Sequence, residues 1–210
     1  MRDARLFIVD DDEAVRESLA ALLVANGFTV SAFATARDFL ERCPPAAEGC
    51  LIADIRMPEM DGLELQEQAA KRLPGIAVVI VTGHGDVPLA VRAMKAGAVD
   101  FIEKPFSEDL ILDTVRRALD RPGPASPVES IEAAPIRVRI GTLTQREREV
   151  LEGLVAGLPN KTIAYDLGIS PRTVEVHRAR VMEKMAAKSL SDLVRAAMLA
   201  GLGPRSRDAG

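Results

Sequence analysis

Five short apolar runs alternate with amphipathic helical patterns along residues 1–120 of the chain. Three of these runs are almost continuously apolar, which is typical of strands that are buried on both faces of a parallel sheet. Five strand–helix units of this size predict a doubly wound α/β domain. The expected strands are Leu6–Val9, Thr29–Phe33, Cys50–Ala53, Ala77–Val81 and Asp100–Glu103, and the helices between them include 36–41, Leu63–Arg72, Val87–Ala96 and Ser107–Asp120.

A proline-rich stretch separates this part from the rest of the chain. Residues 121–140 contain four prolines, and each proline removes a backbone donor and disfavours helix at the residue before it. We interpret 121–140 as a linker, with a short strand at its end where Ile136, Val138 and Ile140 alternate with arginines. The predicted domains are therefore 1–120 and 141–203, followed by a tail over 204–210.

The segment after the linker shows helical patterns alone. Thr144–Glu147 has the composition of a capping box at the start of a helix. Gly168 ends a short helix, and Ser170–Pro171 places an N-cap before a proline at the first helical position. This pattern predicts a helix-turn-helix at about 160–179 within a separate all-α, four-helix domain. The expected helices run from Thr144 to about Ala156, from Asn160 to Leu167, from Pro171 to about Met185 and from Ser189 to Ala200.

Composition and charge exclude several classes of protein. Aromatic residues make up 3% of the chain, so stacking platforms for single-stranded nucleic acid are not expected. No apolar run approaches the roughly 20 residues of a membrane span, and acidic residues from Asp10 onward come too early for a signal peptide. Cys43 and Cys50 are too few for a zinc site, and we expect free thiols in a reducing cytoplasm. The net charge is −7 over 1–140 and +3 over 141–210, which suggests two domains with different partners.

Polar side chains stand at the ends of four predicted strands. Asp10–Asp12 follows the first strand, Asp54 the third and Lys104 the fifth, while Thr82 ends the fourth. Taken singly, each has an ordinary explanation, such as an N-cap cluster for Asp10–Asp12 or a solvated surface charge for Lys104. Their joint placement favours a site, because the carboxyl ends of parallel strands meet at one edge of the sheet.

The strand order 2-1-3-4-5 would bring the ends of the first and third strands together, and with them Asp10, Asp11 and Asp54. Three crowded carboxylates require a compensating cation, and hard oxygen ligands suit Mg²⁺. Thr82 adds a hydroxyl donor and Lys104 a positive charge. These are the groups that transfer of a phosphoryl group to Asp54 needs, with an aspartyl phosphate as the product.

Residues 1–120 resemble the receiver domains of response regulators, which have the flavodoxin-like fold. The matching stretches are Val9–Asp12, Asp54–Pro58 with Asp61-Gly62, Thr82-Gly83 and Phe101–Phe106. The resemblance implies that Asp54 is the phosphoacceptor. It also implies that Mg²⁺ is held by Asp11, Asp54 and the backbone carbonyl of Arg56, with Asp10 helping through water.

The same resemblance makes Thr82 and Phe101 a switch pair. Thr82 would move toward the phosphoryl group and Phe101 would swing into the space that it leaves. Since phenylalanine lacks the hydroxyl of the tyrosine common in the family, this inward burial is expected to be apolar. The stretch Thr82–Ala98 is similar to that of the FixJ group of regulators.

Residues 143–202 resemble the LuxR/NarL-type DNA-binding domain. We expect Val174, Val181 and Met185 to face the core, with Arg178 at the boundary. The opposite face of the same helix could read base edges in the major groove, and nearby basic residues could contact phosphates. The candidate base-reading residues are Arg172, Thr173, Glu175, Val176 and Ala179, and the candidate phosphate contacts are Lys161, Arg172, His177, Arg180 and Lys184.

Together the two resemblances imply a cytoplasmic transcription factor that is not an enzyme. A sensor histidine kinase would phosphorylate Asp54, and the receiver, a monomer before phosphorylation, would then dimerise through Val87–Ala96 and Phe101–Glu103. The homodimer would bind promoter DNA and activate transcription with RNA polymerase, without a membrane partner. Two alternatives remain open at this point: a Mg²⁺-dependent aspartyl-phosphate phosphatase or phosphotransferase, and a phospho-relay scaffold that does not bind DNA.

Overall fold

The computed structural model describes residues 5–83, 87–120 and 129–202. The expected tail over 204–210 and the first part of the linker, 121–128, lie outside these residues, as do 84–86 of the stretch similar to the FixJ group. The chain divides into two compact units, Met1–Gly85 with Lys95–Gly123 and Asp86–Met94 with Pro124–Gly210. Each unit is described by itself.

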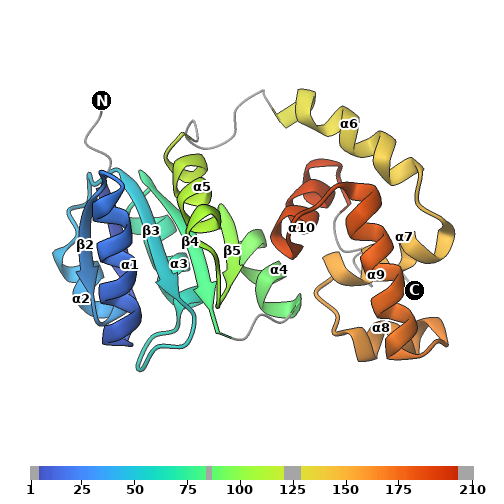
Figure 1. Cartoon of the computed structure of the whole chain (residues 1–210), viewed down its shortest axis with the longest axis horizontal. Coiled ribbons are helices and arrows are strands. Elements are labelled where there is room, and N and C mark those ends of the chain that lie inside the picture. Colours follow the sequence, from blue (N-terminus) through green and yellow to red (C-terminus); the bar gives the residue numbers. More distant parts are fainter. Residues whose placement is uncertain (1–4, 84–86, 121–128, 203–210) are drawn as a thin grey trace. The chain divides into compact units, whose positions relative to one another are not determined.

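The first unit is built on a parallel sheet of five strands in the order β2-β1-β3-β4-β5 (Figure 1). This confirms the expected order 2-1-3-4-5. Along the sheet, Val9 pairs with Phe33 and Ala53, and Asp54 pairs with Val81. The carboxyl ends of the inner strands therefore lie level at one edge. The strands are β1 (Arg5–Val9), β2 (Thr29–Phe33), β3 (Gly49–Asp54), β4 (Ile76–Thr82) and β5 (Asp100–Glu103).

The helices between the strands begin at side chains that accept hydrogen bonds from the first helical turn. Asp12, Thr35, Asp61 and Ser107 are the N-caps of four of them, as their short polar side chains favour. The helices are α1 (Glu13–Ala25), α2 (Ala36–Arg42), α3 (Gly62–Arg72), α4 (Val87–Lys95) and α5 (Glu108–Leu119), of which α4 falls almost entirely in the second unit by its contacts.

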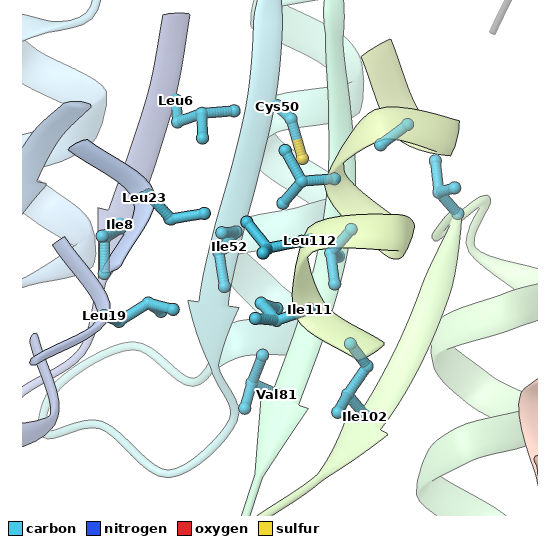
Figure 2. Close-up of a cluster of buried hydrophobic side chains, with 14 residues drawn as sticks. Leu6, Ile8, Leu19, Leu23, Cys50, Ile52, Val81, Ile102, Ile111 and Leu112 are labelled. Atoms are coloured by element: carbon cyan, nitrogen blue, oxygen red, sulfur yellow. The ribbon is translucent and has the colours of Figure 1, made fainter. Parts of the chain in front are cut away.

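Alternation along the strands divides the core between the two faces of the sheet. Figure 2 shows Leu19 and Leu23 of α1 and Ile111 of α5 beside Ile8 and Ile52 of the sheet. Residues one position away face the other side, where Phe7 of β1 and Phe33 of β2 each meet the ring of Phe39 in α2 edge-on, with centroids 5.5 Å apart. Both cysteines are buried free thiols.

The second unit contains the predicted helix-turn-helix with the expected caps. Thr144 and Glu147 form the capping box, Gly168 adopts the left-handed conformation at φ 65°, and Ser170 caps the helix that begins at Pro171. Val150, Leu154, Val174 and Leu193 are fully buried in its core. The helices are α6 (Glu129–Gly141), α7 (Gln145–Val155), α8 (Asn160–Leu167), α9 (Pro171–Met185) and α10 (Leu190–Leu199).

The prediction of a short strand at Ile136–Ile140 is wrong, because these residues belong to the helix α6. Ile140 is buried, Ile136 is half-buried and Val138 is exposed. The isoleucines are four residues apart, so they fit one face of a helix as well as one face of a strand. Packing against α9 and α10 decides between the two, although Pro135 lies inside the helix.

Two hydrogen bonds join this segment to the end of α9. The Arg139 guanidinium donates to the backbone carbonyl of Met185 at 3.3 Å, and the Lys184 ammonium donates to the carbonyl of Thr142 at 3.3 Å. Both accepting carbonyls lie at the C-terminal end of a helix, where the last backbone carbonyls have no partner within the helix. Within the described ranges, no helix is long and apolar enough to cross a membrane.

Candidate functional site

One ammonium lies between two buried carboxylates at the carboxyl edge of the sheet. The Nζ atom of Lys104 is 2.7 Å from Oδ2 of Asp10 and 2.7 Å from Oδ1 of Asp54. Asp10 follows β1, Asp54 ends β3, and the backbone of Lys104 is held by its N–H, which donates to the carbonyl of Thr82 at 2.7 Å. The structure thus brings these three predicted residues together.

The remaining carboxylate oxygens are held by the main chain. Oδ2 of Asp54 accepts a hydrogen bond from the Arg56 N–H at 2.6 Å, and Oδ1 of Asp10 accepts one from the Asp12 N–H at 3.0 Å. Asp54 is 7% exposed and Asp10 is 4% exposed. Because each carboxylate is fixed at both oxygens, the two groups have defined orientations.

Burial and the shared ammonium set the charges in this pocket. Burial raises the pKa of the Asp10 carboxyl, and the hydrogen bond and charge of Lys104 offset only part of this shift. Burial lowers the pKa of Lys104, but its hydrogen bonds to Asp10 and Asp54 outweigh burial, so the net shift is upward. Lys104 is therefore a cation at neutral pH, opposite two carboxylates.

The expected cluster of three carboxylates is not what the structure shows. Asp11 is exposed, and Asp12 instead caps α1 by accepting from the Val15 N–H at 3.1 Å. Among the described residues, no three acidic, histidine or cysteine side chains are placed to hold a metal ion together. The chain leaves the strand after Val9, so Asp10 and Asp11 belong to the loop before α1 and differ in burial.

The donor set nevertheless fits a hard divalent cation. Two buried carboxylates share a single ammonium, which leaves the pocket short of positive charge. Asp11, next to Asp10 in the chain, is exposed and has no place in this pair of buried carboxylates. Mg²⁺ takes few protein oxygens and keeps several waters, so two or three carboxylates with a backbone carbonyl suffice.

The predicted switch residues are both buried. Thr82 ends β4 and is 0% exposed, and Phe101 of β5 is 6% exposed. Ile80 pairs with Phe101 and Thr82 pairs with Glu103 in the β4–β5 register. In this structure Phe101 therefore already lies inside the protein.

Sequence reasoning missed a close backbone approach beside Asp54. A Cβ atom placed on Gly62 would lie 2.3 Å from the carbonyl oxygen of Asp54. The Gly62 N–H also donates to the carbonyl of Ile55 at 3.0 Å. In the Asp61-Gly62 pair noted in the sequence, Asp61 caps the helix, and Gly62, which has no Cβ atom, allows the close approach to the Asp54 carbonyl.

Two arginine contacts were also missed, one beside the pocket and one at the opposite end of β5. Arg16 of α1 donates to the backbone carbonyl of Asp10 at 2.8 Å. Arg117 of α5 pairs with the buried carboxylate of Asp100 at 2.6 Å, and Asp100 also accepts from the Phe101 N–H at 2.8 Å. No sequence motif signals either contact, although Arg16 lies only six residues from Asp10.

The predicted reading face of α9 is largely open. Val174, Val181 and Met185 are buried, as expected, and Arg178 is half-buried. Thr173 is half-buried, and its hydroxyl forms a hydrogen bond with that of Ser170 at 2.8 Å. The exposed members of the predicted reading face are Arg172, Glu175, Val176 and Ala179, and Arg180, a predicted phosphate contact, is exposed as well.

Lys184 is half-buried, unlike the exposed residues of this surface. Its ammonium is 2.6 Å from Oε2 of Glu147, whose side chain is 3% exposed. The same oxygen accepts the Thr144 N–H at 2.8 Å. The predicted phosphate contact at Lys184 thus involves an ammonium that is already paired with Glu147, which a spacing argument on α9 alone could not show.

The other predicted phosphate contacts differ in exposure. Lys161 at the start of α8 is exposed, whereas His177 is half-buried. The Nδ1 atom of His177 is buried and has no hydrogen-bond partner. Only the other edge of this imidazole could reach a ligand.

The ion pair between Lys184 and Glu147 lowers the pKa of the glutamate. The hydrogen bond from Lys184, followed by that from the Thr144 N–H, lowers the pKa of Glu147 from 4.5 to about 2. The Glu147 carboxylate thus links α7, where it completes the capping box, to α9.

Comparisons with known families agree with both halves of this description. Residues 6–116 match the family described as response regulator receiver domain. Residues 141–197 match the family described as bacterial regulatory proteins, luxR family.

Relatives match the chain over most of its length. "Transcriptional regulatory protein FixJ" of Rhizobium meliloti is 53% identical, covering 97% of this chain and 100% of the relative. "Response regulator protein TmoT" of Ectopseudomonas mendocina is 41% identical, covering 92% of this chain and 88% of the relative. A solved structure of full-length FixJ from B. japonicum is 48% identical with a TM-score of 0.53, covering 96% of this chain and 99% of that one.

Proposed function

Since the chain belongs to the FixJ group of response regulators, transcription factors that combine a receiver with a LuxR-type DNA-binding domain, we propose that Asp54 is its phosphoacceptor. The observation that carries the proposal is the shared contact of Lys104 with Asp10 and Asp54. It fixes one oxygen of Asp54 at the open edge of the sheet. The phosphatase and scaffold alternatives have no support in the relatives.

The chain's own residues supply most of what phosphoryl transfer needs. Asp54 forms a P–O bond while the P–N bond of the kinase phosphohistidine breaks, and the histidine leaves as imidazole. Lys104 stabilises negative charge on the phosphoryl oxygens, and Thr82 provides a hydroxyl donor. Asp11, Asp54 and the Arg56 carbonyl would hold Mg²⁺, with Asp10 helping through water. When bound, Mg²⁺ neutralises charge on the phosphoryl group.

The phosphorylated pocket would act through Thr82 and Phe101. Thr82 moves toward the phosphoryl group, and Phe101 shifts into the space that it leaves. Since Phe101 is buried in this structure, its shift is a repacking within the core. The receivers then dimerise through Val87–Ala96 and Phe101–Glu103, which turns a monomer into a homodimer.

The helical unit would bind the promoter DNA. Arg172, Thr173, Glu175, Val176 and Ala179 are the proposed base-reading residues of α9, and Lys161, Arg172, His177 and Arg180 the proposed phosphate contacts. Two tethered domains on a two-fold promoter site gain effective concentration over one. We infer that the homodimer activates transcription with RNA polymerase in the cytoplasm and is not itself an enzyme with a separate substrate.

Intact mass after incubation with Mg²⁺ and acetyl phosphate tests the acceptor. The wild type should gain one phosphoryl group and elute as a dimer, whereas Asp54→Asn should do neither. A mass gain without a change in elution volume would contradict the dimer mechanism alone. A mass gain in Asp54→Asn would reject Asp54 as the acceptor.

A further inference from the structure

Arg16 connects α1 to the main chain of the acidic pocket. Its Nη1 atom donates to the backbone carbonyl of Asp10 at 2.8 Å and lies 3.4 Å from that of Asp11. Arg16 is half-buried. Its guanidinium forms no ion pair in the described part of the chain, so these carbonyls are its partners.

This contact completes the set of hydrogen bonds around Asp10. The Asp10 N–H donates to the carbonyl of Phe33 at 3.3 Å. Its two carboxylate oxygens accept from Asp12 and Lys104 at 3.0 and 2.7 Å. The carbonyl is the last polar group of this residue, and Arg16 holds it.

The peptide plane that follows Asp10 also sets the direction of Asp11. The Asp10 carbonyl belongs to the peptide unit that leads into Asp11, so a hydrogen bond to that oxygen limits rotation of the unit. Arg16 thereby restricts two of the carboxylates that the proposed function assigns to Mg²⁺. A small misplacement of such groups has a large effect on a site that depends on orientation.

We propose that Arg16 is a positioning residue of the cation site, which fixes the backbone of Asp10 and Asp11 for binding Mg²⁺. The inference rests on the proposed function of the pocket. It assigns to Arg16 an effect on metal affinity that passes through main-chain geometry.

The sign of the effect separates positioning from simple electrostatics. A guanidinium near a divalent cation repels it, so charge alone would make Arg16 unfavourable for Mg²⁺. Removing the charge would then strengthen binding. Removing a positioning contact weakens binding, and a lysine in place of Arg16 keeps the charge without the planar donor group.

Calorimetric titration with MgCl₂ tests the proposal on the full chain. We expect Arg16→Gln and Arg16→Lys both to raise the dissociation constant for Mg²⁺ about tenfold, the loss typical of groups that orient metal ligands. Arg116→Gln is the matched control, because Arg116 is exposed on α5 and pairs with Asp113 at 3.4 Å. Its dissociation constant should equal that of the wild type. Thermal unfolding without metal identifies any variant that fails to fold.

Three outcomes would overturn the inference. Tighter binding by Arg16→Gln with unchanged binding by Arg16→Lys would mean that Arg16 acts through its charge. Unchanged affinity in both variants, with a lower Tm, would reduce Arg16 to a structural role. Normal binding by Arg16→Lys with weaker binding by Arg16→Gln would show that the planar guanidinium is not required, against the role assigned to Arg16. If instead the wild type bound no Mg²⁺, the proposed function of the pocket would fail by itself.

Discussion

Lys104 and Asp54 lie 50 residues apart in the chain, yet the ammonium of one is 2.7 Å from a carboxylate oxygen of the other. The contact spans β4, because β3 and β5 flank that strand in the sheet. The same ammonium also binds Asp10. One positive charge therefore serves two buried negative charges.

Lys104→Met should destabilise the receiver and increase its response to Mg²⁺. Loss of the ammonium leaves two buried carboxylates without their charged partner, which should lower the free energy of unfolding by about 1–3 kcal/mol without metal. Mg²⁺ should restore more stability than in the wild type, because it replaces the missing charge. Thermal unfolding in EDTA and in MgCl₂ measures both effects.

Lys71→Met is the control, since Lys71 is exposed on α3. A Lys104→Met protein as stable in EDTA as the wild type would show that the pocket does not depend on this charge.

Gly62→Ala should disturb Asp54 through the backbone. The added methyl would approach the Asp54 carbonyl oxygen to 2.3 Å, so one of the two segments must shift. We expect a loss of about 1–3 kcal/mol in the free energy of unfolding and slower phosphorylation by acetyl phosphate. Gly27→Ala, at a position with no atom within 4 Å of the added carbon but at φ 86°, separates backbone strain from the clash. Equal phosphorylation rates in Gly62→Ala and the wild type would contradict the expectation.

The Glu147–Lys184 pair should make the helical unit sensitive to acid. The pKa of Glu147 falls from 4.5 to about 2 on folding. Its contribution to stability is therefore complete above pH 4.5 and is lost as the pH falls from about 4.5 to about 2. Hydrogen exchange of α7 and α9 should accelerate over this range in the wild type.

The variant Glu147→Gln should lack this particular dependence and exchange faster already at pH 7. Glu152→Gln serves as the control, because Glu152 is 3.9 Å from Arg148 in an exposed pair. An acid response that persists unchanged in Glu147→Gln would assign it to other groups.

Lys161 and Lys184 should differ in their effect on DNA binding. An exposed lysine that contacts a phosphate releases counterions, so Lys161→Gln should reduce the slope of log K against log salt by about 0.9. Lys184→Gln should leave the slope unchanged, because the ammonium is bound to Glu147. Titration of a random DNA duplex at several salt concentrations gives both slopes. A reduced slope for Lys184→Gln would mean that this lysine leaves Glu147 when DNA binds.

Much of the fold follows from patterns within short segments. The strand and helix bounds agree with the expected ones to within one or two residues in most cases. The reason is that the buried apolar residues recur in the sequence at the spacing of a strand or of a helix. The pair Ile136 and Ile140 is the exception, since their spacing fits a strand as well as a helix, and Pro135 favoured the strand, which was wrong.

The candidate pocket was predictable for a related reason. Asp10, Asp54 and Lys104 stand at strand ends, and a parallel sheet brings such ends together. Side-chain contacts between different helices were not predictable in this way. Lys184 has the spacing of a surface residue on α9, and only the packing of α7 against α9 shows that its ammonium is paired with Glu147.

The helix α6 shortens the tether that precedes the DNA-binding helices. Its 13 residues span about 20 Å as a helix, whereas the same residues fully extended would reach about 45 Å. The hydrogen bond from Arg139 to the last turn of α9 anchors one end of this rod. The end of α6 is thus attached directly to the recognition helix, so we expect a displacement of α6 to move α9 as well.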